Sequence, residues 1–484
     1  MTLAPDPLLE RIRQDPDALA LRAPSATWTR AQLLDAADGL AAALHGEGLG
    51  ADRRVACLLE EDAPAVTLIH AARRLGAVHL PLNRRASATE LRAQLERAHA
   101  DGLLCDATNA AKAGEAAPDG VRIHRIEALL AGTGCAAPPR LRDRVDSVAP
   151  ATIVFTSGTT DRPKGAWLTH DNHRASAHAW AALLRPQPGD RWLLCVPLFH
   201  VAGLAIVTRA TRWGATLEVH DRFDPTAVSA AIDDGVTHLS LVATQLVGLL
   251  AARADRPVPP TLRAILLGGG PMPAELLRRA RATGYPVLTT YGLTETGSGV
   301  VSGGDDQATL DDPAAGRALP GVELRVAPDA EILVRGEMVF AGYVDDEAAT
   351  AQALPGDGWL HTGDHGTLDD RLLRIDARRD DLIISGGENI VPAEVEAVLE
   401  AHPGVVEAAV VGVADEHWGA VPRAFIVTSG PDSPDDEELA GFCRSRLAGF
   451  KVPTSFVRLE ALPRNALGKV ARSELAGTSR AGTS

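Results

Sequence analysis

Hydrophobic residues recur with two different periods along the first half of this chain. Residues 27–47, TWTRAQLLDAADGLAAALHGE, place apolar side chains three and four positions apart, which predicts an amphipathic helix. The segment ADRRVACLLEED (51–62) predicts a turn and a strand, residues 64–75 predict a helix, and AVHLPLN (77–83) predicts the next strand. This alternation continues to about residue 290, so we expect a parallel sheet covered by helices.

The pattern changes twice in the second half of the chain. Short strands separated by turns run from Val322 to about Arg374 and predict a β-rich subdomain. From Asp380 onwards, the segments LIIS, PAEVEAVLEAHPG, VEAAVVGVAD, RAFIVTS, DDEELAGFCRSRLAG and SFVRLE predict a small α+β domain. The Ala-rich, polar stretch 108–118 is expected to form an exposed loop.

These patterns together predict an α/β protein of two domains. We expect a large N-terminal domain of βα-layered sheets with a β-rich subdomain over residues 1–379, and a small C-terminal α+β domain over residues 380–475. The last residues, 476–484 (AGTSRAGTS), carry almost no hydrophobic side chains and are expected to be disordered.

Composition narrows the class of protein. A chain of 484 residues is too long for one ordinary core, and 45% hydrophobic with 23% charged residues is typical of globular proteins. The net charge of −15 argues against nucleic acid or an anionic membrane surface as a partner. There is no signal-peptide pattern and no apolar run of membrane-spanning length. The five cysteines are scattered without metal-ligand spacing, so we expect reduced thiols and a cytoplasmic location.

The stretch 153–170, IVFTSGTTDRPKGAWLTH, carries the first candidate chemistry. An apolar β-branched run ends in small and hydroxyl-bearing residues, whose N–H and O–H groups can surround the oxygens of a polyphosphate. Lys164, one of only four lysines among the 48 basic residues, would add a compact positive charge. The P-loop pattern is not met, because Pro163 stands where its second glycine belongs. An ordinary hydroxyl-rich turn is the alternative.

Two further stretches suit a nucleotide. Residues 266–271, LLGGGP, predict a strand that runs into a glycine turn, which a flat ring could approach closely, although such turns are common. Residues 291–295, YGLTE, follow another apolar strand. They offer an aromatic face, a hydroxyl group and a carboxylate of the kind that binds Mg²⁺.

The chain resembles the adenylate-forming enzymes, which include acyl-CoA synthetases, luciferases and the adenylation domains of peptide synthetases. Their TSGTTGxPKG signature is similar to TSGTTDRPKG here, with Asp161 in place of glycine. Their YGxTE, GWxxTGD and PRxxxGK patterns are matched at 291–295, 358–364 and 463–469. The arginine segment 374–382 departs from the usual Gly-Arg because Ala377 precedes Arg378, and SGGENI follows at 385–390. Six such motifs occur in the family's order.

The resemblance implies an enzyme that uses ATP, Mg²⁺ and coenzyme A, and it implies roles for individual residues. Tyr291 would stack on adenine, Asp364 would bind the ribose, and Asp380 would be the hinge of a mobile C-terminal lid. The other implied ATP- or AMP-binding residues are Thr156, Ser157, Gly158, Thr159, Thr160, Gly268, Gly269, Gly270 and Arg378. The implied catalytic residues are Lys469, Glu295 (which also binds Mg²⁺), Thr294 and Lys164. The implied CoA-binding residues are Gly386, Gly387, Trp418 and Phe450.

The resemblance also narrows the substrate class. The chain ends soon after Lys469 without a carrier-protein segment, and SGGENI is similar to acyl-CoA synthetases. CVPLFHVAGL (195–204), SLVATQL (240–246) and LLGGGPMP (266–273) most resemble o-succinylbenzoate–CoA ligases of menaquinone biosynthesis. The implied acyl pocket consists of His200, Gln245, Gly292 and Ser298. Arg209, Arg212 and Arg222 are candidates to meet a second carboxylate.

Alternatives stay open within and beyond this class. They are another aryl- or fatty-acyl-CoA ligase, a stand-alone adenylating enzyme that loads a carrier protein, and a non-catalytic adenylate-binding protein, which Asp161 favours slightly. The expected partners are a small carboxylic acid, ATP and CoA, without nucleic acid or membrane insertion, and a homodimer is compatible with the sequence.

Overall fold

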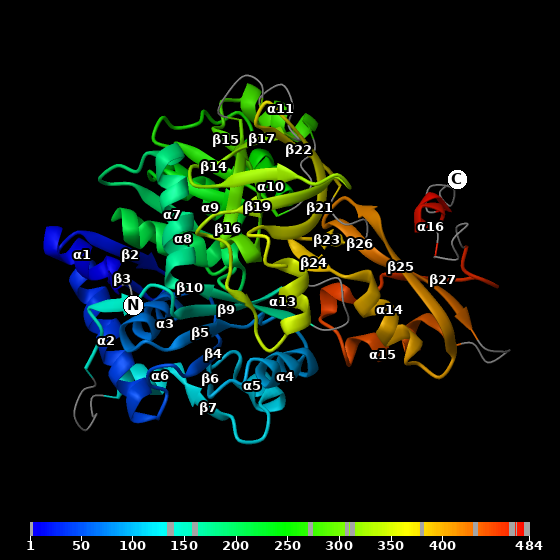
Figure 1. Cartoon of the computed structure of the whole chain (residues 1–484), viewed down its shortest axis with the longest axis horizontal. Helices are drawn as coiled ribbons and strands as arrows, with labels where there is room; N and C mark the ends of the chain where they lie inside the picture. Colours follow the sequence, from blue (N-terminus) through cyan, green and yellow to red (C-terminus); the bar gives the residue numbers. More distant parts are fainter. Residues whose placement is uncertain are drawn as a thin grey trace. The chain divides into compact units, whose positions relative to one another are not determined.

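The computed structural model describes residues 3–132, 140–156, 163–269, 274–304, 309, 315–377, 382–428, 434–463, 470 and 472–478 (Figure 1). The chain forms two compact units. The first unit comprises Met1–Arg84, Leu95–Phe155 and Gly165–Asp376. The second unit comprises Arg85–Gln94, Thr156–Lys164 and Ala377–Ser484. The boundary expected at residue 380 lies outside the described residues.

One long sheet has the strand order β20-β10-β9-β5-β4-β6-β7. The strands from β9 to β7 pair in parallel, as the alternation of strand and helix predicts. The bounds are β4 (Arg54–Leu58), β5 (Val78–Pro81), β6 (Gly102–Cys105), β7 (Arg122–Arg125), β9 (Pro150–Thr156), β10 (Lys164–Thr169) and β20 (Gly342–Tyr343).

A second sheet has the order β18-β19-β21-β22-β17-β16-β15-β14-β13-β11-β12-β2-β3. Its strands pair in parallel from β15 to β2 and antiparallel from β15 to β17, so the pattern changes close to residue 290, as predicted. The bounds are β2 (Leu19–Ala23), β3 (Ala26–Thr29), β11 (Arg191–Leu194), β12 (Thr216–Val219), β13 (His238–Leu241), β14 (Ala264–Leu267), β15 (Val287–Leu293), β16 (Ser298–Gly303), β17 (Ala315–Ala318), β18 (Glu323–Val326), β19 (Glu331–Arg335), β21 (Leu360–Asp369) and β22 (Leu372–Ala377). A short separate sheet pairs β1 (Leu3–Pro5) with β8 (Arg144–Asp146).

Local signals in the sequence set the ends of the helices. Thr29 and Gln32 form a reciprocal capping box at the start of α2, and Gly214 ends α8 with a left-handed φ of 74°. The helices are α1 (Pro7–Gln14), α2 (Arg30–Gly46), α3 (Ala63–Leu75), α4 (Ala88–Arg97), α5 (Ala110–Ala116), α6 (Ile126–Ala131), α7 (His170–Leu184), α8 (Val201–Trp213), α9 (Pro225–Asp233), α10 (Ala243–Arg253), α11 (Ala274–Ala282) and α13 (Glu347–Ala353). Helices α7 and α8 run beside each other (Figure 1).

One expectation for the first unit is wrong. Residues 110–116 form α5 rather than an exposed loop, and Ala113 and Ala116 are fully buried. Alanine has the highest helix propensity of any residue, and its small side chain lets this helix lie close to the sheet. The polar composition of the stretch belongs to its exposed face.

The C-terminal part of the second unit has the small α+β fold that the sequence predicts. Its sheet has the order β24-β23-β26-β25, with β27 on β26, and Val395 and Leu399 of α14 are buried in its core. The bounds are β23 (Ile383–Ser385), β24 (Glu388–Ile390), β25 (Val405–Asp415), β26 (Gly419–Thr428), β27 (Ser455–Arg458), α14 (Pro392–Glu400), α15 (Asp436–Arg444) and α16 (Arg472–Thr478). Helix α16 continues to Thr478, so the first three residues of the tail expected to be disordered are helical, and the rest lie outside the described residues.

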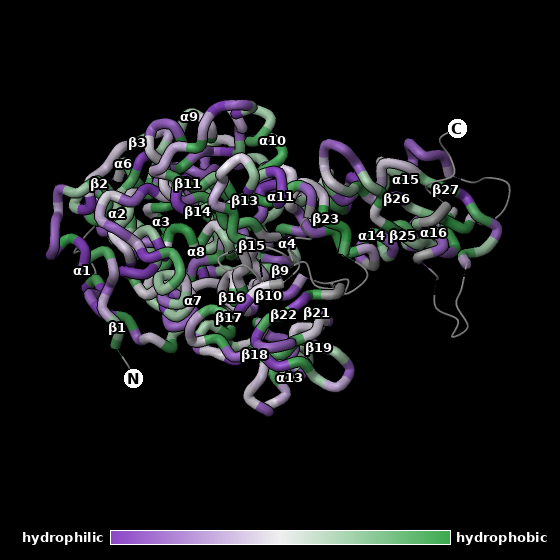
Figure 2. Tube along the Cα trace, turned by 90° about the horizontal axis from the view of Figure 1, so that it is seen from above, coloured by the Kyte–Doolittle hydropathy of each residue, from purple (hydrophilic) through white to green (hydrophobic). Residues whose placement is uncertain are grey.

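Hydrophobic and hydrophilic stretches alternate within single elements along the trace in Figure 2, as in elements that bury one face. The α/β class is confirmed. No helix within the described ranges is long and apolar enough to cross a membrane. Cys57, Cys105, Cys195 and Cys443 are buried free thiols.

Candidate active site

The YGLTE segment folds as a tight hairpin between β15 and β16. A bulge falls between Tyr291 and Gly292, and a 3₁₀ turn over Thr294–Thr296 joins the two strands. A Cβ atom on Gly292 would lie 2.1 Å from the carbonyl oxygen of Ser298, so only glycine fits at this position. The hairpin therefore fixes Tyr291, Thr294, Glu295 and Ser298 in one small region.

The residues expected to bind adenine and ribose lie together. The hydroxyl group of Tyr291 donates a 2.8 Å hydrogen bond to Oδ2 of Asp364, which comes from β21. Both residues are buried. A carboxylate held in this way can accept hydrogen bonds from vicinal ribose hydroxyl groups.

The glycine turn after β14 lies against the same hairpin. A Cβ atom on Gly268 would lie 2.3 Å from Oγ1 of Thr290, the residue before Tyr291. Gly269 has a φ of 84°, a conformation that glycine adopts readily. The backbone of this turn has no side chain to keep a flat ring away, and the assignment of Gly268 and Gly269 to the nucleotide site stays a prediction.

Glu295 offers a carboxylate whose position is held at two points. The hydroxyl group of Tyr343 donates a 2.6 Å hydrogen bond to its Oε1, and the backbone N–H of Phe340 donates a 2.8 Å bond to its carbonyl oxygen. The described ranges contain no group of three or more His, Cys, Asp or Glu side chains that could hold a metal alone. Mg²⁺ is commonly bound by one or two carboxylates together with substrate phosphates and water, so Glu295 fits this ion.

Arg209, on α8, is a buried cation beside Ser298. Its side chain is 2% exposed, and its Nη2 donates a 3.0 Å hydrogen bond to Oγ of Ser298. The guanidinium lies 5.0 Å from the ring centre of Trp180 and 5.7 Å from that of Trp192. Burial lowers the pKa of Arg209 to about 9. Within the described part of the chain it has no ion pair, and its Nε has no hydrogen-bond partner.

The other two arginine candidates lie elsewhere. Arg212 is on α8, and burial, together with the charges of Arg73 and Arg174, lowers its pKa to about 10. Arg222 is exposed. Arg209, in contrast, contacts Ser298, a residue expected in the acyl pocket.

The remaining acyl-pocket residues are less closely tied together. His200 precedes α8, and its ring lies 4.7 Å from that of Phe199. Oε1 of Gln245 accepts a 3.0 Å hydrogen bond from the backbone N–H of Val242, which holds the start of α10. The assignment of His200 and Gln245 to the pocket stays a prediction.

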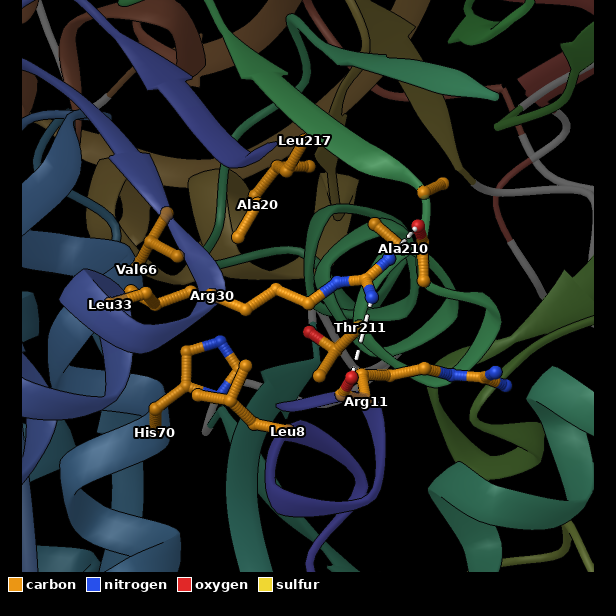
Figure 3. A pocket seen from close by; sticks show the side chains of 12 residues that line it. Leu8, Arg11, Ala20, Arg30, Leu33, Val66, His70, Ala210, Thr211 and Leu217 are labelled. Atoms are coloured by element: carbon orange, nitrogen blue, oxygen red, sulfur yellow. Dashed lines mark hydrogen bonds between the residues drawn. The ribbon is translucent and has the colours of Figure 1, made fainter. Parts of the chain in front are cut away.

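A small pocket is lined by residues of α1, α2, α3 and α8, and none of them is an expected nucleotide- or CoA-binding residue (Figure 3). The side chain of Arg30 reaches across it, and Arg11, His70, Leu33 and Leu217 are among the residues that line it. The cavity of about 20 Å³ has room for roughly one water molecule. Nε of Arg11 donates to the carbonyl oxygen of Arg212, and Nη2 of Arg30 donates to that of Gly214, each at 2.9 Å. These guanidinium groups stabilise the C-terminal end of α8, the helix that carries Arg209.

In the second unit, two of the expected CoA-binding residues lie in contact. A Cβ atom on Gly386 would lie 2.7 Å from the ring of Trp418, and the backbone N–H of Gly386 donates a 2.8 Å bond to the carbonyl oxygen of Trp418. The indole is 50% exposed, and Gly386 and Gly387 have φ values of 56° and 87°. Phe450 instead packs against the core of this unit.

The stretch expected to bind phosphate is described only at its ends. Thr156 ends β9 and Lys164 begins β10, and Oγ1 of Thr156 donates a 3.4 Å bond to the carbonyl oxygen of Lys164. Several expected site residues lie outside the described residues: Ser157, Gly158, Thr159, Thr160, Asp161, Gly270, Arg378, Asp380 and Lys469.

Sequence reasoning missed Tyr343 and the tryptophan pair around Arg209. The chain has only three tyrosines, and two of them donate hydrogen bonds to carboxylates expected in the site: Asp364, expected to bind the ribose, and Glu295, expected to bind Mg²⁺. That scarcity was a usable signal. Trp180 and Trp192 gave none, because a tryptophan in an apolar stretch is indistinguishable from core packing.

The family of the protein follows from comparison with known proteins. The model of AMP-binding enzymes matches residues 8–344, and the model of the AMP-binding enzyme C-terminal domain matches residues 394–469. The chain therefore belongs to the AMP-binding, adenylate-forming enzymes, and the resemblance to this family is confirmed.

Particular relatives agree with the narrower resemblance. A 2-succinylbenzoate–CoA ligase of Bacillus mycoides (strain KBAB4) is 38% identical over 486 residues, which cover 98% of each chain. The o-succinylbenzoate CoA synthetase of Bacillus subtilis, as a double mutant bound with its product analogue OSB-NCoA, matches with a TM-score of 0.92 and 36% identity over 98% of this chain and 99% of that one. The same enzyme in complex with ATP and magnesium ion matches with a TM-score of 0.75 and 36% identity over 98% and 100% of the two chains.

Proposed function

We propose that this protein is an AMP-forming acid–CoA ligase whose acid is 2-succinylbenzoate, which assigns it to menaquinone biosynthesis. A carboxylate of the acid would attack the α-phosphorus of ATP and release pyrophosphate, which leaves an acyl-adenylate. The thiol of CoA would then attack the acyl carbon and release AMP. The similarity to ligases named for this acid, over nearly the whole chain, supports the proposal.

The burial of the Arg209 guanidinium is the structural observation that favours an acid with a second carboxylate. A buried charge without a counter-charge is strongly unfavourable, and an anion beside Arg209 would relieve it. 2-Succinylbenzoate has two carboxylates, so one can react while the other binds the guanidinium. A fatty acid has a single carboxylate, which the reaction consumes, and would leave Arg209 uncompensated.

The residues of the site divide the remaining work. Gly268, Gly269, Tyr291 and Asp364 would hold the adenosine part of ATP. Glu295, together with the hydroxyl group of Thr294, would face the Mg²⁺ that neutralises the phosphates when bound.

Lys164 and Lys469 would stabilise negative charge on the phosphates as the carboxylate approaches. Gly386 and Gly387 would let the thin arm of CoA pass beside Trp418. Because ATP and CoA are both supplied in the cytoplasm, we assign the reaction to that compartment, with the small-molecule substrates as partners and a homodimer compatible with it.

The test is pyrophosphate release with ATP and a panel of acids, with and without CoA. We expect the highest kcat/KM with 2-succinylbenzoate, a large loss with 4-oxo-4-phenylbutanoate, which lacks the ring carboxylate, and AMP as the nucleotide product. ADP as the product would overturn the chemistry, and equal use of the two acids would overturn the assigned substrate. Pyrophosphate release without thioester formation would favour a stand-alone adenylating enzyme.

A further inference from the structure

We propose that Tyr343 is a positioning residue for Glu295, which it holds in the orientation that receives the Mg²⁺ of Mg²⁺·ATP. This inference rests on the metal-binding role proposed for Glu295. Tyr343 would not touch the metal or the substrate. Its contribution would be to fix the plane of the carboxylate before the metal arrives.

The geometry indicates that the hydrogen bond from Tyr343 holds the carboxylate of Glu295 rigidly and is not an incidental contact. The distance of 2.6 Å from Oη of Tyr343 to Oε1 of Glu295 is typical of a hydroxyl group that donates to a charged carboxylate. The two residues are 48 positions apart in the chain, so the contact depends on the fold. Both side chains are half-buried, which limits competition from water.

Tyr343 is itself held from three sides. It lies in β20, where it pairs with Ala166 of β10, and its backbone N–H donates a 2.9 Å bond to Oγ1 of Thr350. Its ring meets that of Phe340 edge to face, with the centres 4.8 Å apart. Because Phe340 also binds the backbone of Glu295, one short segment fixes both the main chain and the side chain of the glutamate.

A fixed carboxylate matters for this particular ion. Mg²⁺ requires nearly ideal octahedral geometry and gives up its water reluctantly, so a freely rotating ligand binds it poorly. Residues that orient a metal ligand typically contribute 10- to 100-fold to metal affinity. We therefore expect loss of the Tyr343 hydroxyl group to weaken metal-dependent nucleotide binding about 10-fold.

The three tyrosines of the chain provide a matched set of variants. Tyr343→Phe removes the hydroxyl group that binds Glu295, and Tyr291→Phe removes the one that binds Asp364. Tyr285→Phe removes a buried hydroxyl group in the separate apolar cluster beneath α9 to α11. Each change deletes one oxygen and leaves a ring in place, and thermal unfolding checks that all three variants fold.

The experiment uses the full chain and two binding measurements. Electron paramagnetic resonance follows the binding of Mn²⁺ in the presence of ATP. Calorimetry follows the binding of AMP without metal. Tyr343→Phe should weaken Mn²⁺ binding about 10-fold and leave AMP binding unchanged. Tyr291→Phe should weaken AMP binding, and Tyr285→Phe should change neither. Normal Mn²⁺ binding by Tyr343→Phe, or an equal loss of AMP binding, would overturn the inference.

A fourth variant separates this inference from the assignment on which it rests. Glu295→Gln should reduce Mn²⁺ binding more than Tyr343→Phe does. If Glu295→Gln binds Mn²⁺ normally, the metal-binding role of Glu295 is wrong, and the inference is overturned with it. If Glu295→Gln loses binding and Tyr343→Phe does not, only the role of Tyr343 is wrong.

Discussion

The hydrogen bond from Arg209 to Ser298 connects two segments that are 89 positions apart in the sequence. One is α8, and the other is the hairpin that also carries Tyr291 and Glu295. The hairpin therefore contributes both to the proposed recognition of the acid and to the proposed binding of ATP. A change in one site can reach the other through a single turn of backbone.

Replacing the buried cation should change the choice of acid. Arg209→Met should raise the KM for 2-succinylbenzoate about 100-fold, equivalent to about 2.7 kcal/mol, because the second carboxylate loses its counter-charge. The KM for ATP should stay near that of the wild type, and the preference over 4-oxo-4-phenylbutanoate should fall. Steady-state kinetics with both acids measures this, with the exposed Arg222→Met as the control. An unchanged preference would remove Arg209 from acid recognition.

The two half-reactions should separate by variant. Lys469→Ala should slow adenylate formation about 100-fold or more, the effect of losing one charge aimed at the transition state, and should spare thioester formation from supplied acyl-adenylate. Gly387→Leu should do the reverse, because added bulk blocks the arm of CoA. Pyrophosphate release and CoA-thioester formation measure the halves separately.

In Gly387→Leu, the effect of backbone strain must be separated from the blocking of the CoA arm. Gly387 has a φ of 87°, so leucine there is strained. Gly356, with a φ of 92° and open space around its Cα, provides a control in Gly356→Leu. Equal impairment of both half-reactions in Lys469→Ala and Gly387→Leu would contradict the division of labour.

Asp161, in the stretch proposed to bind phosphate, should be dispensable. Asp161→Gly should leave the fold intact and keep the affinity for ATP equal or higher, because it removes a negative charge from a segment proposed to bind phosphate. Calorimetric titration with ATP measures this. A tenfold weaker affinity, about 1.4 kcal/mol, would give Asp161 a positive role.

Buried histidines should make the protein sensitive to acid. Burial lowers the pKa of His79 to about 4, and burial together with the charge of nearby Arg73 lowers that of His173 to about 3. Unfolded histidine has a pKa near 6.5, so the unfolded chain takes up protons that the folded protein rejects. Stability is therefore complete above about pH 6.5 and falls as the pH drops towards 4, by about 1.4 kcal/mol per pH unit for each such histidine.

A substitution isolates one of these groups. His79→Met should reduce the slope of unfolding free energy against pH by about 1.4 kcal/mol per unit between pH 6 and 4.5. Urea unfolding at several pH values measures the slope, and the exposed His178→Gln provides the control. An unchanged slope in His79→Met would show that this histidine does not titrate on unfolding.

The elements that the sequence predicted well are those whose patterns are local. The segment PAEVEAVLEAHPG contains α14, and residues 64–75 coincide with α3 almost to the residue. The prediction for segment 110–116 was wrong because its alanines do not alternate with polar residues at the period of a helix. Only the neighbouring elements decide which of these alanines are buried. Tyr291 and Asp364 were identified separately by motif, and the fold supplied their contact. The roles of Tyr343 and Trp180 depend on partners far away in the sequence, which no local pattern encodes.

The two indole rings around Arg209 give the protein an optical signal of its own. Trp180 and Trp192 are fully buried, and each lies within 6 Å of the guanidinium. Indole emission responds to nearby charge, so neutralising this cation with a carboxylate should shift the fluorescence of the protein. Occupancy of the acid site could then be followed without label, cofactor or turnover. A ligand that leaves the guanidinium uncompensated should leave the tryptophan emission unchanged.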